Sequence, residues 1–359
     1  MTTAETLPRI TAKGVVIAVL ISLVLGIGLS EMLLRIAMPH WKDFASARFM
    51  TRVVVPGHNP VLAGRPGFDG YFSQNNGDFR VRLQLNEFGH RNPEKVAAAD
   101  GQIWVIGDSM TFGWGVEREE MYSEVLENRI GHPSYNLASP GTDICGYQAM
   151  VARMPKNIKP RSVVVGLILE NDLRIYDCKA EALAAAAQPQ EPDNSDTALS
   201  FYAFKQFATQ NFALYNFLAV SLKRVAIVQD LLVRLGIVSR PHIVTAEIDP
   251  NAFAVLADSA GAEMERLRSM FPAGTPFLVL IVANRFEIRD NAPTNRDLRL
   301  AVKNELRRRG IATGDPFEAF RDAGFAPTHF KHDGHWSARG HLIAGKAVAE
   351  SLRAIQGGK

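Results

Sequence analysis

The chain has 359 residues, of which 47% are apolar and 21% are charged, with 28 glycines and 19 prolines. This composition excludes collagen-like, globally disordered and coiled-coil proteins, and the length allows two or three domains, or one large domain with attachments. Forty basic and 37 acidic residues give a net charge of +3 without a long basic run, which argues against a nucleic-acid partner, and two cysteines are too few for a four-thiolate zinc site.

The first predicted element is a membrane-spanning helix over residues 14–38. Residues 14–30 are seventeen positions without a charge, and about 17 apolar residues is the minimum that crosses a bilayer core. Large residues follow this run where a cleaved signal peptide would have small ones, so the pattern favours an uncleaved signal anchor. A buried N-terminal helix is the alternative, but such a helix normally has polar positions on one face.

The flanking charges do not decide the orientation of this helix, because Arg9 and Lys13 precede its uncharged run, whereas Arg35, Lys42, Arg48 and Arg52 follow that run. A tail of 13 residues is easily left inside, whereas long domains translocate largely regardless of their charge. We therefore expect residues 1–13 to form a cytoplasmic tail. The chain would cross the lipid bilayer once, and its remainder would lie in the periplasm or outside the cell.

Residues 39–100 are rich in glycine, asparagine and proline, and we expect an accessory β or irregular region there. Within it, residues 70–89 indicate two short extended stretches around an Asn-Asn-Gly turn. From residue 101 to 355, apolar strands alternate with helical patterns, which is typical of a parallel sheet covered by helices on both faces. The expected strands are 102–107, 135–138, 162–169, 277–283 and, more weakly, 311–313.

A long interruption separates the third and fourth strands, and we assign residues 180–245 to a helical insertion. Residues 180–200 have the composition of a linker, whereas residues 201–235 carry apolar side chains at helical spacing. Charges within the second segment argue against another membrane span. We interpret the insertion as a cap over the sheet, with a helix on the membrane surface or against a partner as the alternative. An amphipathic helix over residues 337–355 closes the chain.

Polar residues follow the predicted strands at the edge where function gathers in an open parallel sheet. Ser109 lies in a Gly-Asp-Ser turn directly after the first strand, where its hydroxyl can project from the sheet and its N–H can face a developing oxyanion. A loop with Gly141 follows the second strand, and Asn171 follows the third. Ordinary turns and helix caps explain each loop equally well when it is taken alone.

A histidine-rich segment just before the final helix offers a base for Ser109. A neutral imidazole can take the proton of a serine hydroxyl, and a carboxylate on its other nitrogen holds the tautomer. His335 and Asp333 suit those roles. Alternatively, His329, His332 and His335 could hold zinc together with Asp333, although such a site would leave the serine and asparagine loops unexplained.

Four motifs resemble, in this order, the four blocks of the SGNH hydrolases, also called GDSL esterases: GDSMTFG at 107–113, SPGTD at 139–143, ENDL at 170–173 and DGHWSARG at 333–340. The resemblance covers about residues 100 to 355. NEFGHR at 86–91 is similar to a lead-in of membrane-anchored bacterial members. The resemblance implies a flavodoxin-like three-layer α/β/α fold with a parallel sheet, a serine esterase that uses no metal or other cofactor, and a location in the bacterial inner membrane.

Position by position, the resemblance implies that Ser109 is the nucleophile, that His335 is the base and that Asp333 orients it. The N–H groups of Ser109 and Gly141 and the side-chain amide of Asn171 would form the oxyanion hole. The usual final block has its aspartate three residues before the histidine, whereas this sequence has a histidine there and the aspartate two before. This DxHW form is similar to that of the subgroup that acts on acetylated exopolysaccharides.

The expected function is a membrane-anchored, extracytoplasmic serine esterase or O-acyltransferase. Its substrate would be an O-acyl ester, with acetyl groups on an envelope or exported polysaccharide as the expected choice, and an acyl-enzyme on Ser109 would be resolved by water or by an acceptor hydroxyl. The alternative is a non-catalytic envelope protein of the same fold that binds glycan or scaffolds a synthesis complex. Cys145 and Cys178 follow the second and third loops, and they could form a disulfide in an oxidising compartment or remain two buried thiols.

Overall fold

The computed structural model describes residues 11–74, 77–187, 207–221 and 249–357 of the chain. Most of the expected cytoplasmic tail at 1–13 lies outside the described residues. The same holds for residues 188–206 and 222–248, which make up most of the expected insertion at 180–245.

A five-stranded parallel sheet forms the centre of the molecule, with the strand order β6-β5-β7-β8-β9. Counted within this sheet, the order is 2-1-3-4-5, which is the flavodoxin-like arrangement. Every residue of β5, β6, β7 and β8 is buried, because helices cover both faces of the sheet. This burial explains why β5, β7 and β8 consist almost entirely of apolar residues. The predicted α/β class and the parallel sheet are confirmed. The strands are β5 (Ile103–Ile106), β6 (Ser134–Asn136), β7 (Ser162–Ile168), β8 (Phe277–Val282) and β9 (Ala312–Gly314).

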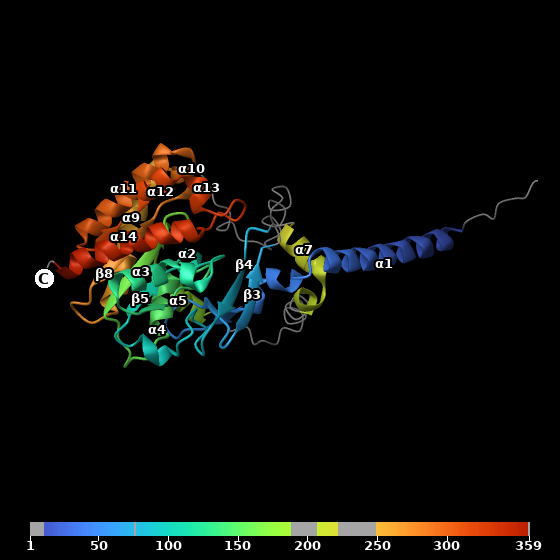
Figure 1. Ribbon diagram of the computed structural model, residues 1–359, viewed down its shortest axis with the longest axis horizontal. Helices are drawn as coiled ribbons and strands as arrows, with labels where there is room; N and C mark the ends of the chain where they lie inside the picture. The colour runs from blue at the N-terminus through green and yellow to red at the C-terminus, as the bar shows by residue number, and fades with distance from the viewer. Residues whose placement is uncertain (1–10, 75–76, 188–206, 222–248, 358–359) are drawn as a thin grey trace, which may run out of the picture.

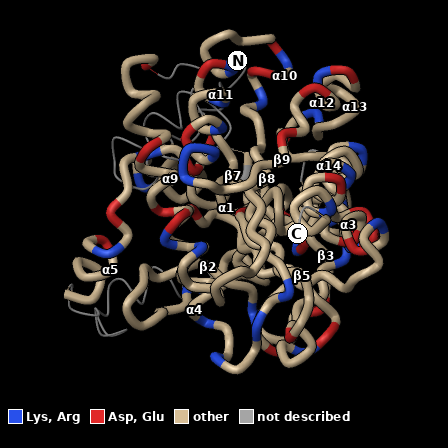
Figure 2. Tube along the Cα trace, turned by 90° about the vertical axis from the view of Figure 1, so that its left-hand side faces the viewer, with Lys and Arg blue, Asp and Glu red and all other residues tan. Residues whose placement is uncertain are grey.

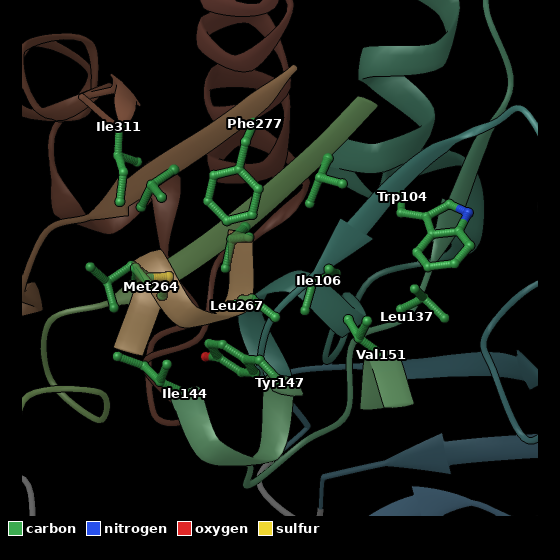
Figure 3. Packing of buried hydrophobic residues seen from close by; sticks show 14 of the residues in the cluster. Trp104, Ile106, Leu137, Ile144, Tyr147, Val151, Met264, Leu267, Phe277 and Ile311 are labelled. Atoms are coloured by element: carbon green, nitrogen blue, oxygen red, sulfur yellow. The ribbon is translucent and has the colours of Figure 1, made fainter. Parts of the chain in front are cut away.

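Two hydrophobic cores lie on opposite faces of the sheet, since successive strand residues point to opposite sides. Val165 belongs to the core under α4 (Ile144–Ala152), α9 (Phe253–Ser269) and α11 (Pro293–Arg308). Tyr147 and Met264 in this core come from two of these helices and point toward the strands (Figure 3). The opposite core packs under three other helices, which are α3 (Tyr122–Ile130), α12 (Phe317–Ala323) and α14 (Ala338–Gly357).

Short elements connect these layers. Basic and acidic residues are interspersed along the Cα trace in Figure 2. Arg309 illustrates this mixing, because it pairs with Glu305 of α11 at 2.6 Å and with Glu265 of α9 at 2.9 Å. The short elements are η3 (Val96–Ala99), α2 (Ser109–Phe112), η4 (Arg118–Glu120), α5 (Cys178–Ala187), η7 (Pro250–Ala252), α10 (Arg285–Asp290) and α13 (Phe325–Thr328).

The accessory region contains two antiparallel hairpins, of which only the second lies where the sequence predicts short extended stretches, at 70–89. The first pairs β1 (Met50–Val53) with β2 (Val61–Gly64), and the second pairs β3 (Asp69–Ser73) with β4 (Arg80–Gln84). The second hairpin shares a hydrophobic core with residues near the end of α2. It therefore packs at the edge of the sheet where the strands end.

The N-terminal helix α1 (Ala12–Ala37) projects away from the α/β body (Figure 1). Among the described helices it alone is long and apolar enough to cross a membrane, as an anchor or as a signal sequence would. Two 3₁₀ turns, η1 (Trp41–Phe44) and η2 (Ser46–Arg48), follow it.

For residues 213–221 of the expected insertion, the interpretation as a cap over the sheet is wrong. Helix α7 (Ala213–Ser221) packs against α1 and η1, beside the base of the projecting helix (Figure 1). The carboxylate of Glu31 in α1 accepts hydrogen bonds from the N–H groups of Ala213 and Leu214, at 2.9 and 2.8 Å. A charged side chain of α1 thus satisfies backbone donors that α7 would otherwise leave open at its first turn.

Candidate active site

Ser109 is the first residue of α2, in the tight turn that follows β5. Asp108 caps this short helix, because its carboxylate accepts the N–H of Met110 at 2.8 Å. Gly107 has no room for a side chain, since a Cβ atom there would overlap the side chain of Thr111. The glycine therefore permits the sharp change from strand to helix that carries the serine to the sheet edge.

Arg91 of the NEFGHR segment supports the chain that follows this turn. Its guanidinium is buried and donates hydrogen bonds to the carbonyl groups of Phe112 at 3.1 Å, Val116 at 2.7 Å and Gly113. Burial lowers the pKa of Arg91 to about 10. At neutral pH the side chain remains a cation that holds three carbonyl groups of the loop in place.

The hydroxyl of Ser109 meets the imidazole of His335 from the far end of the chain. Oγ of the serine lies 2.8 Å from Nε2 of the histidine, across a sequence separation of 226 residues. A carboxylate oxygen of Asp333 contacts the other ring nitrogen, Nδ1. The three side chains predicted for catalysis are thus joined in one row of hydrogen bonds.

The other two histidines of this segment face elsewhere. Nδ1 of His332 lies 2.8 Å from a carboxylate oxygen of Asp78. His329 is buried against Phe325, with ring centroids 4.3 Å apart, and burial lowers its pKa to about 3. Within the described ranges, no group of three or more His, Cys, Asp or Glu side chains is arranged to hold a metal ion. The geometry therefore does not support the zinc alternative.

Asn171 lies in the loop after β7 and contacts the turn that carries Ser109. Its side-chain amide donates to Oδ2 of Asp108 at 3.0 Å, and the same oxygen lies 3.5 Å from Oγ of Ser109. Because a carboxamide nitrogen carries two hydrogens, this bond orients the group and leaves the second hydrogen for another acceptor. Burial raises the pKa of Asp108, an effect that the hydrogen bond from Asn171 opposes.

Gly141 lies in the loop between β6 and α4, with a φ of +76° that favours glycine. Two residues earlier, the N–H of Ser139 donates to the carbonyl of Gly107 at 3.0 Å. This bond fastens the Gly141 loop to the nucleophile turn.

The loops that carry Ser109, Gly141 and Asn171 all follow strands at the same edge of the sheet. The strands β5 and β7 flank the point where the strand order reverses. Ligands bind at such a switch point in open α/β sheets.

A buried carboxyl that sequence reasoning left without a role supports the Asn171 loop from beneath. Oδ2 of Asp172 accepts the hydroxyl of Tyr147 and the N–H of Ile168, both at 2.7 Å. Burial raises the pKa of Asp172 well above its ordinary value. The residue therefore joins α4 to the end of β7 through hydrogen bonds.

Cys145 and Cys178 form a disulfide in the structure. The first lies in α4 just after the Gly141 loop, and the second begins α5 after the Asn171 loop. Arg174 reinforces this link, because it pairs with Asp143 at 2.8 Å and with Glu181 at 2.6 Å. The two loops are thus tied to each other by a covalent bond and by an ion-pair bridge.

Sequence reasoning also missed an aromatic support for the base. Trp114, just beyond α2, stacks on the imidazole of His335, with ring centroids 5.6 Å apart and an interplanar angle of 29°. The only sequence signal was the position of Trp114 shortly after the Ser109 turn.

No protein-family model matches the sequence, and no curated protein matches it. Solved structures do show similarity. A member of the lipolytic protein G-D-S-L family from Veillonella parvula DSM 2008 is 12% identical, with a TM-score of 0.37 over 69% of this chain and 96% of that chain. The lipase Lip_vut3 from a goat rumen metagenome is 14% identical, with a TM-score of 0.38 over 70% of this chain and 97% of that chain. A carbohydrate esterase family 2 enzyme with a carbohydrate binding domain, from Corynascus thermopiles (Myceliophthora fergusii), is 15% identical, with a TM-score of 0.40 over 86% of this chain and 88% of that chain. At these identities and TM-scores the similarity assigns no activity to this chain.

Proposed function

We propose that the protein is a serine esterase or O-acyltransferase of the SGNH type whose nucleophile is Ser109. One observation carries this proposal, namely the 2.8 Å contact between Oγ of Ser109 and Nε2 of His335, with Asp333 on the opposite ring nitrogen. A hydroxyl within reach of a base that a carboxylate orients is the arrangement that acyl transfer through a serine requires.

In the first half of the proposed reaction, Nε2 of His335 accepts the hydroxyl proton while Oγ of Ser109 attacks the ester carbonyl. Asp333 stabilises the imidazolium that results and remains ionised. The N–H groups of Ser109 and Gly141 and the second amide hydrogen of Asn171 would bind the oxyanion. Collapse of the tetrahedral intermediate breaks the ester C–O bond, and the imidazolium donates its proton to the departing alcohol.

In the second half, His335 takes a proton from water or from an acceptor hydroxyl, which attacks the acyl group on Ser109. The oxyanion donors act again, and the serine oxygen leaves with the proton from the imidazolium. Hydrolysis and transfer differ only in this second nucleophile. The protein side chains have the same roles in both.

The proposed location is the outer side of a bacterial inner membrane, with α1 as a retained anchor and residues 1–13 in the cytoplasm. The hydrogen bonds from α7 to Glu31 support retention, because cleavage after α1 would remove a contact of the folded protein. The disulfide supports an oxidising compartment. In this location the proposed substrates are O-acetyl esters of an envelope or exported polysaccharide.

A fluorophosphonate probe tests the nucleophile directly. Wild-type protein should be labelled on the peptide that contains Ser109, and Ser109→Ala should not be labelled. Ser269→Ala is the matched control, because this exposed serine only caps the end of α9 through the carbonyl of Arg266. If folded wild-type protein is not labelled and does not hydrolyse p-nitrophenyl acetate, the proposal is wrong and the non-catalytic binding protein becomes the better interpretation.

A further inference from the structure

We infer that the β3–β4 hairpin of the accessory region is a positioning element of the active site, in which Gln74 orients the carboxylate of Asp333 and Asp78 fixes the loop that carries it. The inference rests on the proposed function, because it assigns a role to residues that act through Asp333. Gln74 and Asp78 lie between the two strands of the hairpin. Neither was a candidate site residue in the sequence.

The first contact is a hydrogen bond to the proposed catalytic carboxylate itself. Nε2 of Gln74 donates to Oδ2 of Asp333 at 2.7 Å, across 259 residues of sequence. The other oxygen, Oδ1, contacts Nδ1 of His335. A carboxylate that is held at both oxygens cannot rotate about its terminal bond without losing one of these partners. The amide of Gln74 therefore keeps Oδ1 directed at the imidazole, as outer hydrogen bonds fix the ligands of metal sites.

The second contact fixes the residue immediately before Asp333. One carboxylate oxygen of Asp78 accepts the backbone N–H of His332 at 3.0 Å, and the other lies 2.8 Å from its Nδ1. The side chain of Asp78 is only 6% exposed, whereas that of His332 is 47% exposed. The exposed imidazole of His332 thus contacts a buried carboxylate of the hairpin. Two consecutive residues of the catalytic loop are held by the same short turn.

The apolar face of the hairpin supports the imidazole by a second route. The rings of Phe79 and Phe330 lie 5.2 Å apart, which joins the hairpin to the start of the loop. Phe72 contacts Trp114 edge-on at 4.4 Å, and Trp114 stacks on His335. A Cβ atom at Gly115 would lie 2.6 Å from Phe330 and 2.7 Å from Phe79, so this junction is tightly packed. Hydrogen bonds and aromatic packing from one hairpin thus converge on the Asp333 and His335 pair.

The loop has little support of its own. It is irregular apart from an isolated bridge between His329 and Trp336, and it includes Gly334 at a φ of +82°. Inside it, the N–H of Phe330 donates to the carbonyl of His335 at 2.8 Å, and the N–H of Gly334 donates to the carbonyl of Phe330 at 3.3 Å. External contacts must therefore set the positions of the side chains at its tip.

Substitutions at Gln74, assayed in the full-length protein, test this role. Gln74→Met removes the donor and keeps the length of the side chain, so kcat for p-nitrophenyl acetate should fall about tenfold while KM stays within about twofold. In the Gln74→Glu protein, kcat at neutral pH should fall further than in Gln74→Met. This substitution should also move the acid limb of the kcat profile to higher pH, because two carboxyls in hydrogen-bonding contact share a proton. Gln84→Met is the matched control in the same hairpin, since its amide only donates to Asp69 at 3.2 Å, and it should leave kcat and the pH profile unchanged.

The result that would overturn the inference is a Gln74→Met protein with wild-type kcat, or a Gln74→Glu protein whose acid limb stays in place. If either variant fails to fold, Asp78→Ala replaces it, and the rate of fluorophosphonate labelling at Ser109 should fall about tenfold in folded protein; an unchanged labelling rate would count against the inference. Absence of labelling in the wild type would instead overturn the proposed function, so the two failures are distinguishable.

Discussion

Replacing Asp333 with asparagine removes the charge beside the base with the least change of shape. The carboxylate is 9% exposed and the imidazole of His335 is 22% exposed, so the pair lies near the surface but is partly shielded from water. Unit charges about 4 Å apart in such a setting interact by about 4 kcal/mol. The interaction exists only while the imidazolium is present, so its loss raises the barrier. Since about 1.4 kcal/mol corresponds to a factor of ten, kcat should fall about a thousandfold.

The assay is steady-state hydrolysis of p-nitrophenyl acetate, with thermal unfolding as the measure of folding. KM should stay within about twofold, because Asp333 does not touch the substrate in the proposed reaction. Asp322→Asn is the matched control, since this aspartate is exposed and only pairs with its neighbour Arg321. A folded Asp333→Asn protein that loses less than about tenfold in kcat would refute the reasoning, because the imidazole would then work without the carboxylate.

Three further predictions concern the support of the site. Asn171→Ala should lower kcat by about 10² to 10³, as expected for the loss of one oxyanion donor, and pre-steady-state kinetics should show that acylation and deacylation are both slower. The buried carboxyl of Asp172 has a raised pKa, so the folded chain keeps a proton there that the unfolded chain releases above about pH 4. Its contribution to stability therefore falls as pH rises, and Asp172→Asn should lose less stability than the wild type between about pH 5 and pH 8 in urea titrations. The disulfide joins cysteines 33 residues apart, so the double substitution of Cys145 and Cys178 by serine should lower the free energy of unfolding by about 4 kcal/mol in the same assay.

The sheet was predictable because burial on both faces produces a simple sequence pattern, a continuous run of apolar or small residues. A strand such as Ser162–Ile168 has no solvent-facing side, so all of its positions are apolar or small. The loops that follow such strands must meet at one edge, and this constraint linked Ser109 to Asn171 without coordinates. The convergence of His335 on Ser109 could be expected only from the resemblance and from the chemistry of the residues, since 226 positions separate them.

Contacts between distant surface segments produce no such pattern in the sequence. Glu31 of α1 accepts hydrogen bonds from two N–H groups of α7. The periodicity of apolar residues in α1 and α7 does not indicate that these two helices pack against each other. The pairing of Gln74 with Asp333 is similar, because a glutamine in a polar turn reads as an ordinary solvent-exposed residue. His332 stands where the family usually has its aspartate, and no pattern in the sequence indicates that its imidazole contacts Asp78.

The disulfide has a consequence for when the protein can work. Its two ends enclose β7 and the Asn171 loop, and Cys145 follows Gly141 closely, so both proposed donors outside the nucleophile turn lie on segments that oxidation joins. A newly made chain in a reducing cytoplasm would hold two thiols instead. In such a chain the loops that carry Gly141 and Asn171 would not yet be joined, so in the proposed extracytoplasmic location full activity would develop only after export. Such timing would spare the esters of the cell that makes the protein.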